Sequence, residues 1–180
     1  FQKIFKLALP LLPYREPDIL ESISDIPEII IKNQCKKPII VTDKGIVSLG
    51  LTNSLIEALN QGKIDFALYD KTVPNPTTDN VAEALDLYKN QNCDCIIAFG
   101  GGSSMDCAKA LGACVAYPKK PLSKMKGILK VVRKIPLLIA IPTTAGTGSE
   151  TTLAAVITDS NTRHKYAINS FPLIPRYAVL

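Results

Sequence analysis

The stretch Cys95-Ile-Ile-Ala-Phe-Gly-Gly-Gly-Ser-Ser-Met-Asp-Cys-Ala-Lys109 passes from a short apolar run through three glycines into a helical pattern. Residues 96–99 are all apolar, which is typical of a strand that is buried on both faces in a parallel sheet. We expect Ser103 to cap the helix that follows, with Asp106 as its capping-box partner. The stretch therefore predicts a strand, a glycine turn and a helix N-terminus in immediate succession.

A glycine turn at a helix N-terminus suits the binding of phosphate. Glycine has no Cβ to hold a ligand away from the backbone, and the first turn of a helix offers free N–H groups and a positive dipole end. The alternative is a tight strand-to-helix turn without a ligand, but three successive glycines favour phosphate. The stretch matches neither the G-x-G-x-x-G fingerprint nor a P-loop, so it names no particular nucleotide-binding motif.

Strand-like and helix-like segments alternate along the chain on both sides of this stretch. Strands are expected at residues 38–43, 64–69, 95–99 and 137–141, and two more at 154–158 and 165–169. One helix is expected after the turn at 43–45 and as far as about Asn60, with Leu51, Leu55 and Leu59 on one apolar stripe. Others are expected from Thr77 or Thr78 onward, and after the glycines as far as Tyr117. This alternation predicts an α/β fold with a doubly wound, mainly parallel, Rossmann-like sheet covered on both faces.

The first 36 residues are less regular. Prolines interrupt an extended arm at 4–12, and a helical pattern runs over 18–34 with Pro27 inside it. We expect residues 1–36 to form an N-terminal arm and helix packed on the same domain. Residues 37–180 are expected to form the dinucleotide-binding α/β domain.

Composition and charge narrow the class of protein. The 180 residues suffice for one sizeable core, and the net charge of +5 comes from scattered basic residues. The basic stretch at 119–134 has no interleaved aromatic residues, so we interpret it as a solvated face, with a nucleic-acid groove as the alternative. We expect no membrane partner, because no apolar run is long enough to span a bilayer. The five cysteines form no C-x-x-C pair, which indicates reduced packing residues in a cytoplasmic protein.

Polar and glycine residues follow several of the expected strands, where ligands bind in open α/β sheets. The candidate ligand-binding residues are Asp43, Asn75, Gly101, Gly102, Ser103, Thr143, Thr144, Thr147 and Lys165. Asp43 could accept hydrogen bonds from a ribose diol and would repel a 2′-phosphate, although a turn aspartate fits equally well. The threonine loop could be only a solvated loop, and Lys165 could only face water. His164 is read as a surface residue, and no cluster of His, Cys, Asp or Glu has metal-ligand spacing.

Four motifs together resemble the iron-containing (group III) alcohol dehydrogenases. They are Val41-Thr-Asp-Lys44, Val73-Pro-Asn-Pro-Thr77, Gly100–Lys109 and Ile141–Glu150, and the likeness covers about residues 37–180. The resemblance implies a cofactor domain followed by an all-helical domain, with the active site between them. It places Asp43 near the adenosine ribose and Asn75 in a loop lining the cleft. Gly101, Gly102 and Ser103 become the pyrophosphate loop, Thr143, Thr144 and Thr147 line the cofactor's other side, and Lys165 contacts it.

The resemblance also implies an activity for the whole enzyme. It would transfer a hydride between NAD(H), with NADP(H) less favoured, and a primary alcohol or aldehyde. Its Fe²⁺ or Zn²⁺ would be held by an aspartate and three histidines that follow Leu180. The chain is then expected to be an inactive fragment, in which an exposed apolar cleft wall would favour a homo-oligomer. The alternatives are a sister enzyme of the glycerol dehydrogenase, dehydroquinate synthase or maleylacetate reductase type, and a nucleotide-binding module without catalysis.

Overall fold

The apolar run before the glycines becomes β4 (Cys95–Gly100), a central strand of a six-stranded sheet in a computed structural model that describes residues 14–180. It lies between β2 (Pro38–Val41) and β6 (Leu137–Pro142), and Ile97 is in register with Ile40 and Ile139. All three isoleucines are completely buried. A strand with neighbours on both edges and helices on both faces has no exposed side, so its continuous apolar sequence is explained.

Every pair of neighbouring strands in this sheet is parallel, and the strand order is β1-β9-β6-β4-β2-β3. The remaining members are β1 (Asp18–Leu20), β3 (Ala67–Tyr69) and β9 (Tyr177–Val179). The predicted doubly wound parallel fold is therefore confirmed. The strand expected at 64–69 begins only at Ala67.

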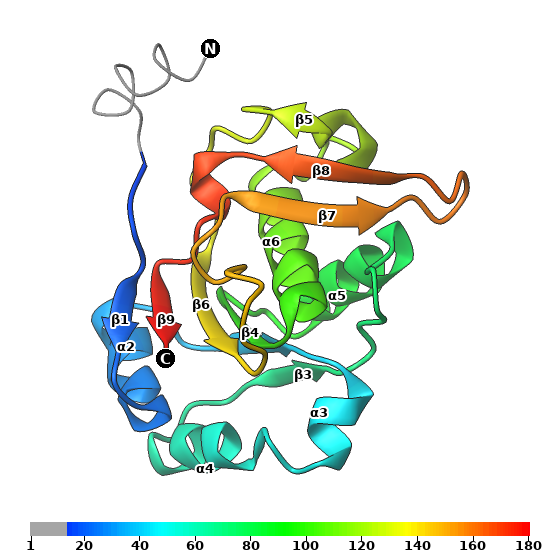
Figure 1. Cartoon of the computed structure of the whole chain (residues 1–180). Coiled ribbons are helices and arrows are strands. Elements are labelled where there is room, and N and C mark those ends of the chain that lie inside the picture. Colours follow the sequence, from blue (N-terminus) through cyan, green and yellow to red (C-terminus); the bar gives the residue numbers. More distant parts are fainter. Residues whose placement is uncertain (1–13) are drawn as a thin grey trace.

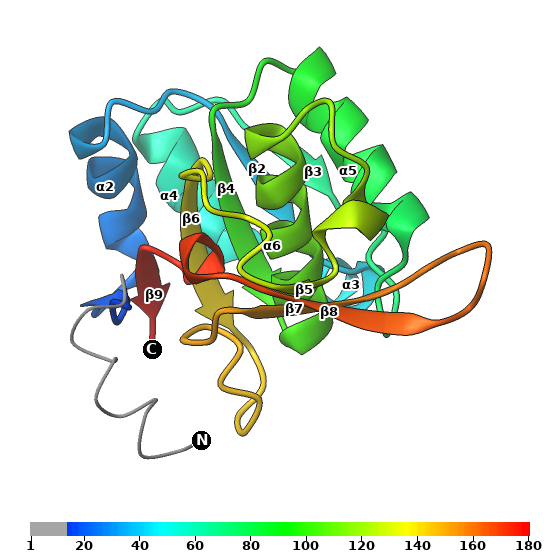
Figure 2. The same ribbon diagram turned by 90° about the horizontal axis from the view of Figure 1, so that it is seen from above.

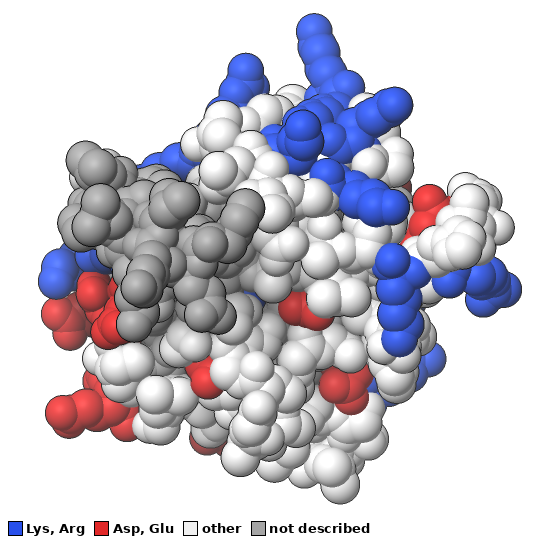
Figure 3. Space-filling model, turned by 45° about the horizontal axis from the view of Figure 1, so that its top comes forward, with Lys and Arg blue, Asp and Glu red and all other residues white. Residues whose placement is uncertain are grey.

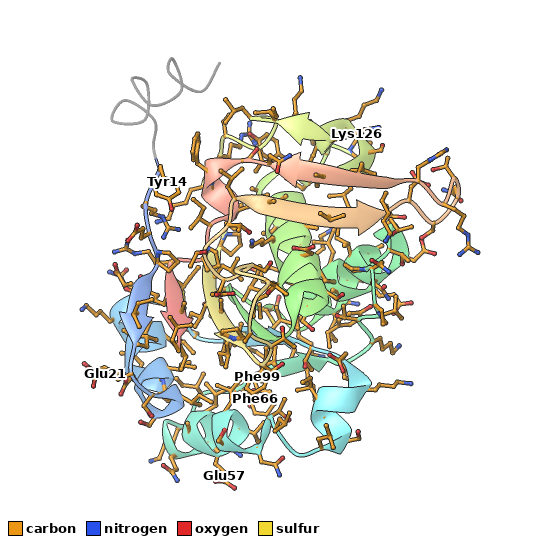
Figure 4. The ribbon with its side chains drawn as sticks, viewed as in Figure 1. Tyr14, Glu21, Glu57, Phe66, Phe99 and Lys126 are labelled. Atoms are coloured by element: carbon orange, nitrogen blue, oxygen red, sulfur yellow. The ribbon has the colours of Figure 1, made fainter. Side chains whose placement is uncertain are left out.

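Helices cover both faces of the sheet (Figure 2). The helices α5 (Thr78–Asn90) and α6 (Gly102–Ala116) pack on one face, and α2 (Ile26–Lys32) and α4 (Asn53–Gln61) pack on the other. In Figure 4 the labelled Phe99 and Phe66 lie between the sheet and α4, and both belong to the apolar cluster on that side. Two separate apolar clusters therefore pack against the two faces of β4.

A small second sheet lies beyond α6. It consists of β5 (Gly127–Ile128), β8 (Lys165–Asn169) and β7 (Ala154–Thr158), in that order. The two strands expected at its core are confirmed as an antiparallel hairpin, while β5 was not predicted. Figure 1 shows the hairpin crossing α6, and Ala155, Ile157 and Ile168 bury their side chains in the same cluster as that helix.

The single helix expected between the turn at 43–45 and Asn60 is wrong. The chain forms α3 (Lys44–Ser48) and α4 instead, because Gly50 adopts a left-handed conformation with φ of +70° and ends the first helix. Leu51, which was expected on the buried stripe, is 46% exposed, whereas Leu55 and Leu59 are buried.

The helical interpretation of residues 18–34 is also wrong in its first part. Asp18–Leu20 is an edge strand, with Ile19 opposite Ala178 of β9. The helical part begins after the cap Ser22, with a 3₁₀ turn (η2, Ile23–Asp25) that leads into α2. Pro27 lies in the first turn of α2, where its missing N–H is not needed, so it starts the helix and does not interrupt it. The arm expected at 4–12 lies outside the described residues.

The basic stretch at 119–134 is a surface segment around the 3₁₀ turn η3 (Leu122–Met125). Figure 3 shows Lys and Arg side chains gathered on the upper part of the face in view. Tyr117 lies beneath two of these cations, with its ring centroid 5.2 Å from Lys120 Nζ and 5.0 Å from Arg133 Cζ. Among residues 14–180, no helix is both long and apolar enough to cross a bilayer.

Candidate functional site

A cavity of about 900 Å³ lies at the carboxyl edge of the parallel sheet. Because β2, β3, β4 and β6 are parallel, the loops that follow them meet at this one edge. Seven of the nine candidate residues line the cavity: Asp43, Gly101, Gly102, Ser103, Thr143, Thr144 and Thr147. The fold thus brings together residues that are up to 104 positions apart in the sequence.

The glycine turn and the threonine loop face each other across this cavity. The N–H of Thr143 donates to the carbonyl of Gly100 at 3.0 Å. A Cβ built on Gly101 would lie 3.3 Å from Thr144 Oγ1, and one on Gly102 would lie 3.6 Å from Thr147 Cγ2. The absence of side chains at Gly101 and Gly102 therefore leaves room between the glycine backbone and the hydroxyls of the threonine loop.

The N-terminus of α6 has no side-chain cap, contrary to the prediction for Ser103. Its N-cap is Gly101, and Ser103 lies inside the first turn. Asp106 is not a capping-box partner either, because its carboxylate accepts a hydrogen bond from the Ser149 hydroxyl at 3.3 Å. The first N–H groups of α6 are thus left for another acceptor, beside the positive end of a 15-residue helix.

A buried hydroxyl on the cavity wall also lacks a partner. Ser104 is 1% exposed, and its Oγ makes no hydrogen bond with any of residues 14–180. Buried polar atoms are almost always hydrogen-bonded. An unpartnered donor beside an uncapped helix N-terminus fits a bound anion such as a pyrophosphate.

Asp43 combines the two interpretations that the sequence left open. It is a turn residue, since its Oδ1 accepts the N–H of Ile46 at 3.0 Å and caps α3. It also lines the cavity, and its Oδ2 lies 3.7 Å from the position of a Cβ on Gly100. One carboxylate oxygen is therefore committed to the helix cap, and the other lies next to the glycine turn.

Asn75 and Lys165 lie beside the cavity and are joined to it through Ser103. The Nζ of Lys165 donates to Asn75 Oδ1 at 2.8 Å, and the N–H of Asn75 donates to Ser103 Oγ at 3.3 Å. Asn75 has a φ of +58°, a left-handed conformation that asparagine tolerates better than most residues. Lys165 does not simply face water, because the β8 strand carries it to the loop that follows β3.

Sequence reasoning missed Lys109 as a residue that shapes the site. Lys109 is completely buried, and its Nζ donates to the carbonyls of Ser149 and Thr152 at 2.7 Å and of Ala154 at 2.9 Å. It also contacts Thr152 Oγ1 at 3.0 Å. Burial lowers the pKa of Lys109 to about 8, and the carboxylates of Asp106 and Glu150 oppose that shift. The sequence signal that could have identified Lys109 is a lysine on the expected buried face of a predicted helix.

The clamp by Lys109 acts on the segment that completes the threonine loop. Residues 149–154 connect Thr147 to β7, so fixing their carbonyls fixes the far end of the loop. Burial raises the pKa of Asp106, the neighbour of this clamp, and hydrogen bonds from Val156 N–H and Ser149, together with the Lys109 charge, oppose the rise. The wall of the cavity therefore depends on a buried amine that does not itself line the cavity.

A model of the iron-containing alcohol dehydrogenase family matches residues 20–180. The chain belongs to this family. It is 38% identical over 145 residues to the NAD-dependent methanol dehydrogenase of Bacillus methanolicus, covering 81% of this chain and 38% of the relative. It is 41% identical over 146 residues to the choline dehydrogenase of Bacillus subtilis, covering 80% and 36%. The chain thus spans well under half the length of these relatives.

Solved structures of the family share the fold. A 1,3-propanediol oxidoreductase superposes with a TM-score of 0.86 at 31% identity, over 92% of this chain and 44% of that one. A sulfoacetaldehyde reductase from Bifidobacterium kashiwanohense, solved in complex with NAD⁺, gives a TM-score of 0.77 at 27% identity, over 92% and 45%. The resemblance inferred from the four motifs is therefore confirmed.

Proposed function

We propose that this chain is the cofactor-binding part of a metal-dependent alcohol dehydrogenase. The enzyme would transfer a hydride between NAD(H) and a primary alcohol or aldehyde, with NADP(H) the less favoured cofactor. The observation that carries the proposal is the pairing of the glycine turn with the threonine loop over the uncapped N-terminus of α6. Family membership supports it, and the relatives' names include methanol, choline and 1,3-propanediol dehydrogenases.

In this proposal each candidate residue has a definite role. The backbone of Gly101 and Gly102 and the hydroxyl of Ser103 receive the pyrophosphate, while Thr143, Thr144 and Thr147 contact it from the opposite wall. The free oxygen of Asp43 accepts from the adenosine ribose. Asn75 and Lys165 form a polar edge on which the rest of the dinucleotide rests. Residues 37–180 would form the binding unit, with residues 14–36 packed against it.

The metal belongs to the part of the enzyme that acts on the substrate, and we assign none of its ligands to this chain's cofactor site. When bound, Fe²⁺ or Zn²⁺ would polarise the alcohol or aldehyde oxygen while the nicotinamide exchanges the hydride. The role of this chain is to hold the cofactor in a fixed orientation, which makes the transfer effectively unimolecular.

Titration calorimetry with NAD⁺ and NADP⁺ tests the proposal. We expect saturable binding of NAD⁺ and weaker binding of NADP⁺. Thr144→Val keeps the shape of the side chain but removes one hydroxyl, so NAD⁺ affinity should fall about tenfold, the equivalent of one hydrogen bond to a charged group. Ser123→Ala, which removes an exposed hydroxyl from the basic segment, is the matched control. Absence of NAD⁺ binding to the folded chain, or equal affinity in both variants, would contradict the proposal.

A further inference from the structure

A thiol–carboxylate cluster lies at the edge of the sheet opposite the cofactor cavity. Cys35 comes from the loop between α2 and β2, Asp94 directly precedes β4, and Cys95 is the first residue of that strand. One ligand atom from each residue lies within 4.8 Å of the other two. Sequence spacing did not predict this cluster, because Cys35 is about sixty positions from its partners.

The carboxylate of Asp94 is already held in place. Its Oδ2 accepts the N–H of Lys36 at 2.8 Å, and its Oδ1 accepts the N–H of Lys37 at 3.0 Å. The thiol of Cys35 lies 3.6 Å from the carbonyl of Asn33. Metal-binding carboxylates are typically oriented by such hydrogen bonds from a surrounding shell, and each oxygen still has a free lone pair.

Two of the three residues of the cluster are partly accessible to solvent. Cys95 is completely buried, while Cys35 and Asp94 are half-buried. Cys35 also lines a second cavity of about 770 Å³, together with Asn33 and Lys134. An ion could enter through this cavity. Burial and the negative charge of Asp94 raise the pKa of the Cys35 thiol, and a hydrogen bond with Cys95 and the charge of Lys134 oppose that rise.

We propose that Cys35, Asp94 and Cys95 bind a thiophilic divalent ion of the zinc class. Two thiolate sulfurs and one carboxylate oxygen suit Zn²⁺, and a water molecule would complete a tetrahedron. Zinc–sulfur bonds of about 2.3 Å and zinc–oxygen bonds of about 2.0–2.2 Å place ligand atoms under 4 Å apart, so a small closure of the cluster is sufficient. Binding replaces the two thiol protons, which are released to solvent, and it changes no oxidation state.

An ion at the proposed site would cross-link the loop before β2 to the first residues of β4. These segments already meet through the hydrogen bonds of Asp94, and the ion would add two bonds to sulfur. The site lies at the amino ends of strands whose carboxyl ends form the cofactor cavity. It is therefore independent of the proposed cofactor role, and either proposal can fail alone.

Cadmium is the probe for the experiment, because Cd²⁺ bound to thiolates absorbs in the near ultraviolet. The reduced, metal-free chain is titrated with Cd²⁺, and Zn²⁺ affinity is then measured by competition with a chromophoric chelator. We expect one equivalent of Cd²⁺ with thiolate absorption. Cys35→Ser should weaken Zn²⁺ binding by more than about 100-fold, because loss of a ligand exceeds the effect of an outer-shell change. Asp94→Asn should also weaken it.

Cys114→Ser is the matched control, since Cys114 is a half-buried free cysteine of α6 outside the cluster. It should bind both ions as the unchanged chain does. Circular dichroism verifies that each variant is folded, and Cys35 is exposed enough for serine to be tolerated there. The proposal is refuted if the unchanged chain shows no thiolate–cadmium absorption. It is equally refuted if Cys35→Ser and Cys114→Ser bind Zn²⁺ with the same affinity.

Discussion

Replacing Lys109 by methionine tests how the wall of the cofactor cavity is held. Methionine has a similar length and fills the same buried space, but it offers no donor. The carbonyls of Ser149, Thr152 and Ala154 would each lose the ammonium that now lies within 2.9 Å. The substitution therefore removes the polar clamp with little change in packing.

The size of the effect follows from two opposing terms. Three carbonyls without their donor cost about 1–3 kcal/mol each in buried surroundings. In the other direction, burial lowers the pKa of Lys109 from 10.5 to about 8. This shift corresponds to a cost of roughly 3 kcal/mol for burying the charged amine, which an uncharged methionine avoids. We expect a net decrease in the free energy of unfolding on the order of 3 kcal/mol at neutral pH.

Urea unfolding and hydrogen exchange measure the two consequences separately. Lys109→Met should unfold at a lower urea concentration than the unchanged chain. Its amides at residues 149–154 should exchange faster than those of α6 and of the remainder of β7. If NAD⁺ must reorder the loop, its affinity should fall about tenfold for each 1.4 kcal/mol spent on ordering. Lys89→Met, at an exposed lysine of α5, is the control. The reasoning is refuted if both variants unfold alike and residues 149–154 keep their protection.

Four further outcomes are expected. Between pH 8 and 10.5, Lys109 is protonated in the unfolded chain but not in the folded one. The free energy of unfolding should therefore rise with pH by roughly 3 kcal/mol relative to that of Lys109→Met. Urea titrations at both ends of this pH range measure the difference. Asp43→Ser keeps a capping hydroxyl but removes a charge worth about 1 kcal/mol of repulsion at 4 Å, so calorimetry should show the NADP⁺ to NAD⁺ affinity ratio rising about fivefold. Gly100→Ala would place a Cβ 2.6 Å from Ser104 Oγ and should lose about 2 kcal/mol or more in thermal unfolding, whereas Gly146→Ala, which shares a positive φ but opens into free space, should lose less. Thr77→Ala removes the hydroxyl that caps α5 and should lower the free energy of unfolding by about 1 kcal/mol, measured in urea.

Much of the fold could be predicted because its signals are local. The apolar run of β4, the glycines after it and the helical spacing beyond them are each decided by neighbours within a few residues. Where prediction failed, a distant partner or a single backbone conformation decided the outcome. Asp18–Leu20 is a strand because β9 lies beside it, and Gly50 divides a helical pattern that was continuous by hydrophobic spacing.

The candidate site divides in the same way. The glycine turn and the threonine loop each follow a predicted strand, so their meeting at one edge followed from parallel topology. Ser103 was misjudged as a cap, because Gly101 takes the N-cap position two residues earlier than expected. The binding roles of these residues remain predictions that the titrations above will test.

By itself, the sequence determined the alternation of strands and helices, the parallel sheet and the motifs that define the family, because periodicity and turn chemistry are properties of short segments. Only the tertiary structure decided that Lys165 reaches Asn75, that Lys109 clamps residues 149–154, and that Cys35 meets Asp94 and Cys95. These contacts join residues forty to ninety positions apart. A buried charge or thiol takes whichever partner the packing of whole elements brings to it, and no local pattern encodes that choice.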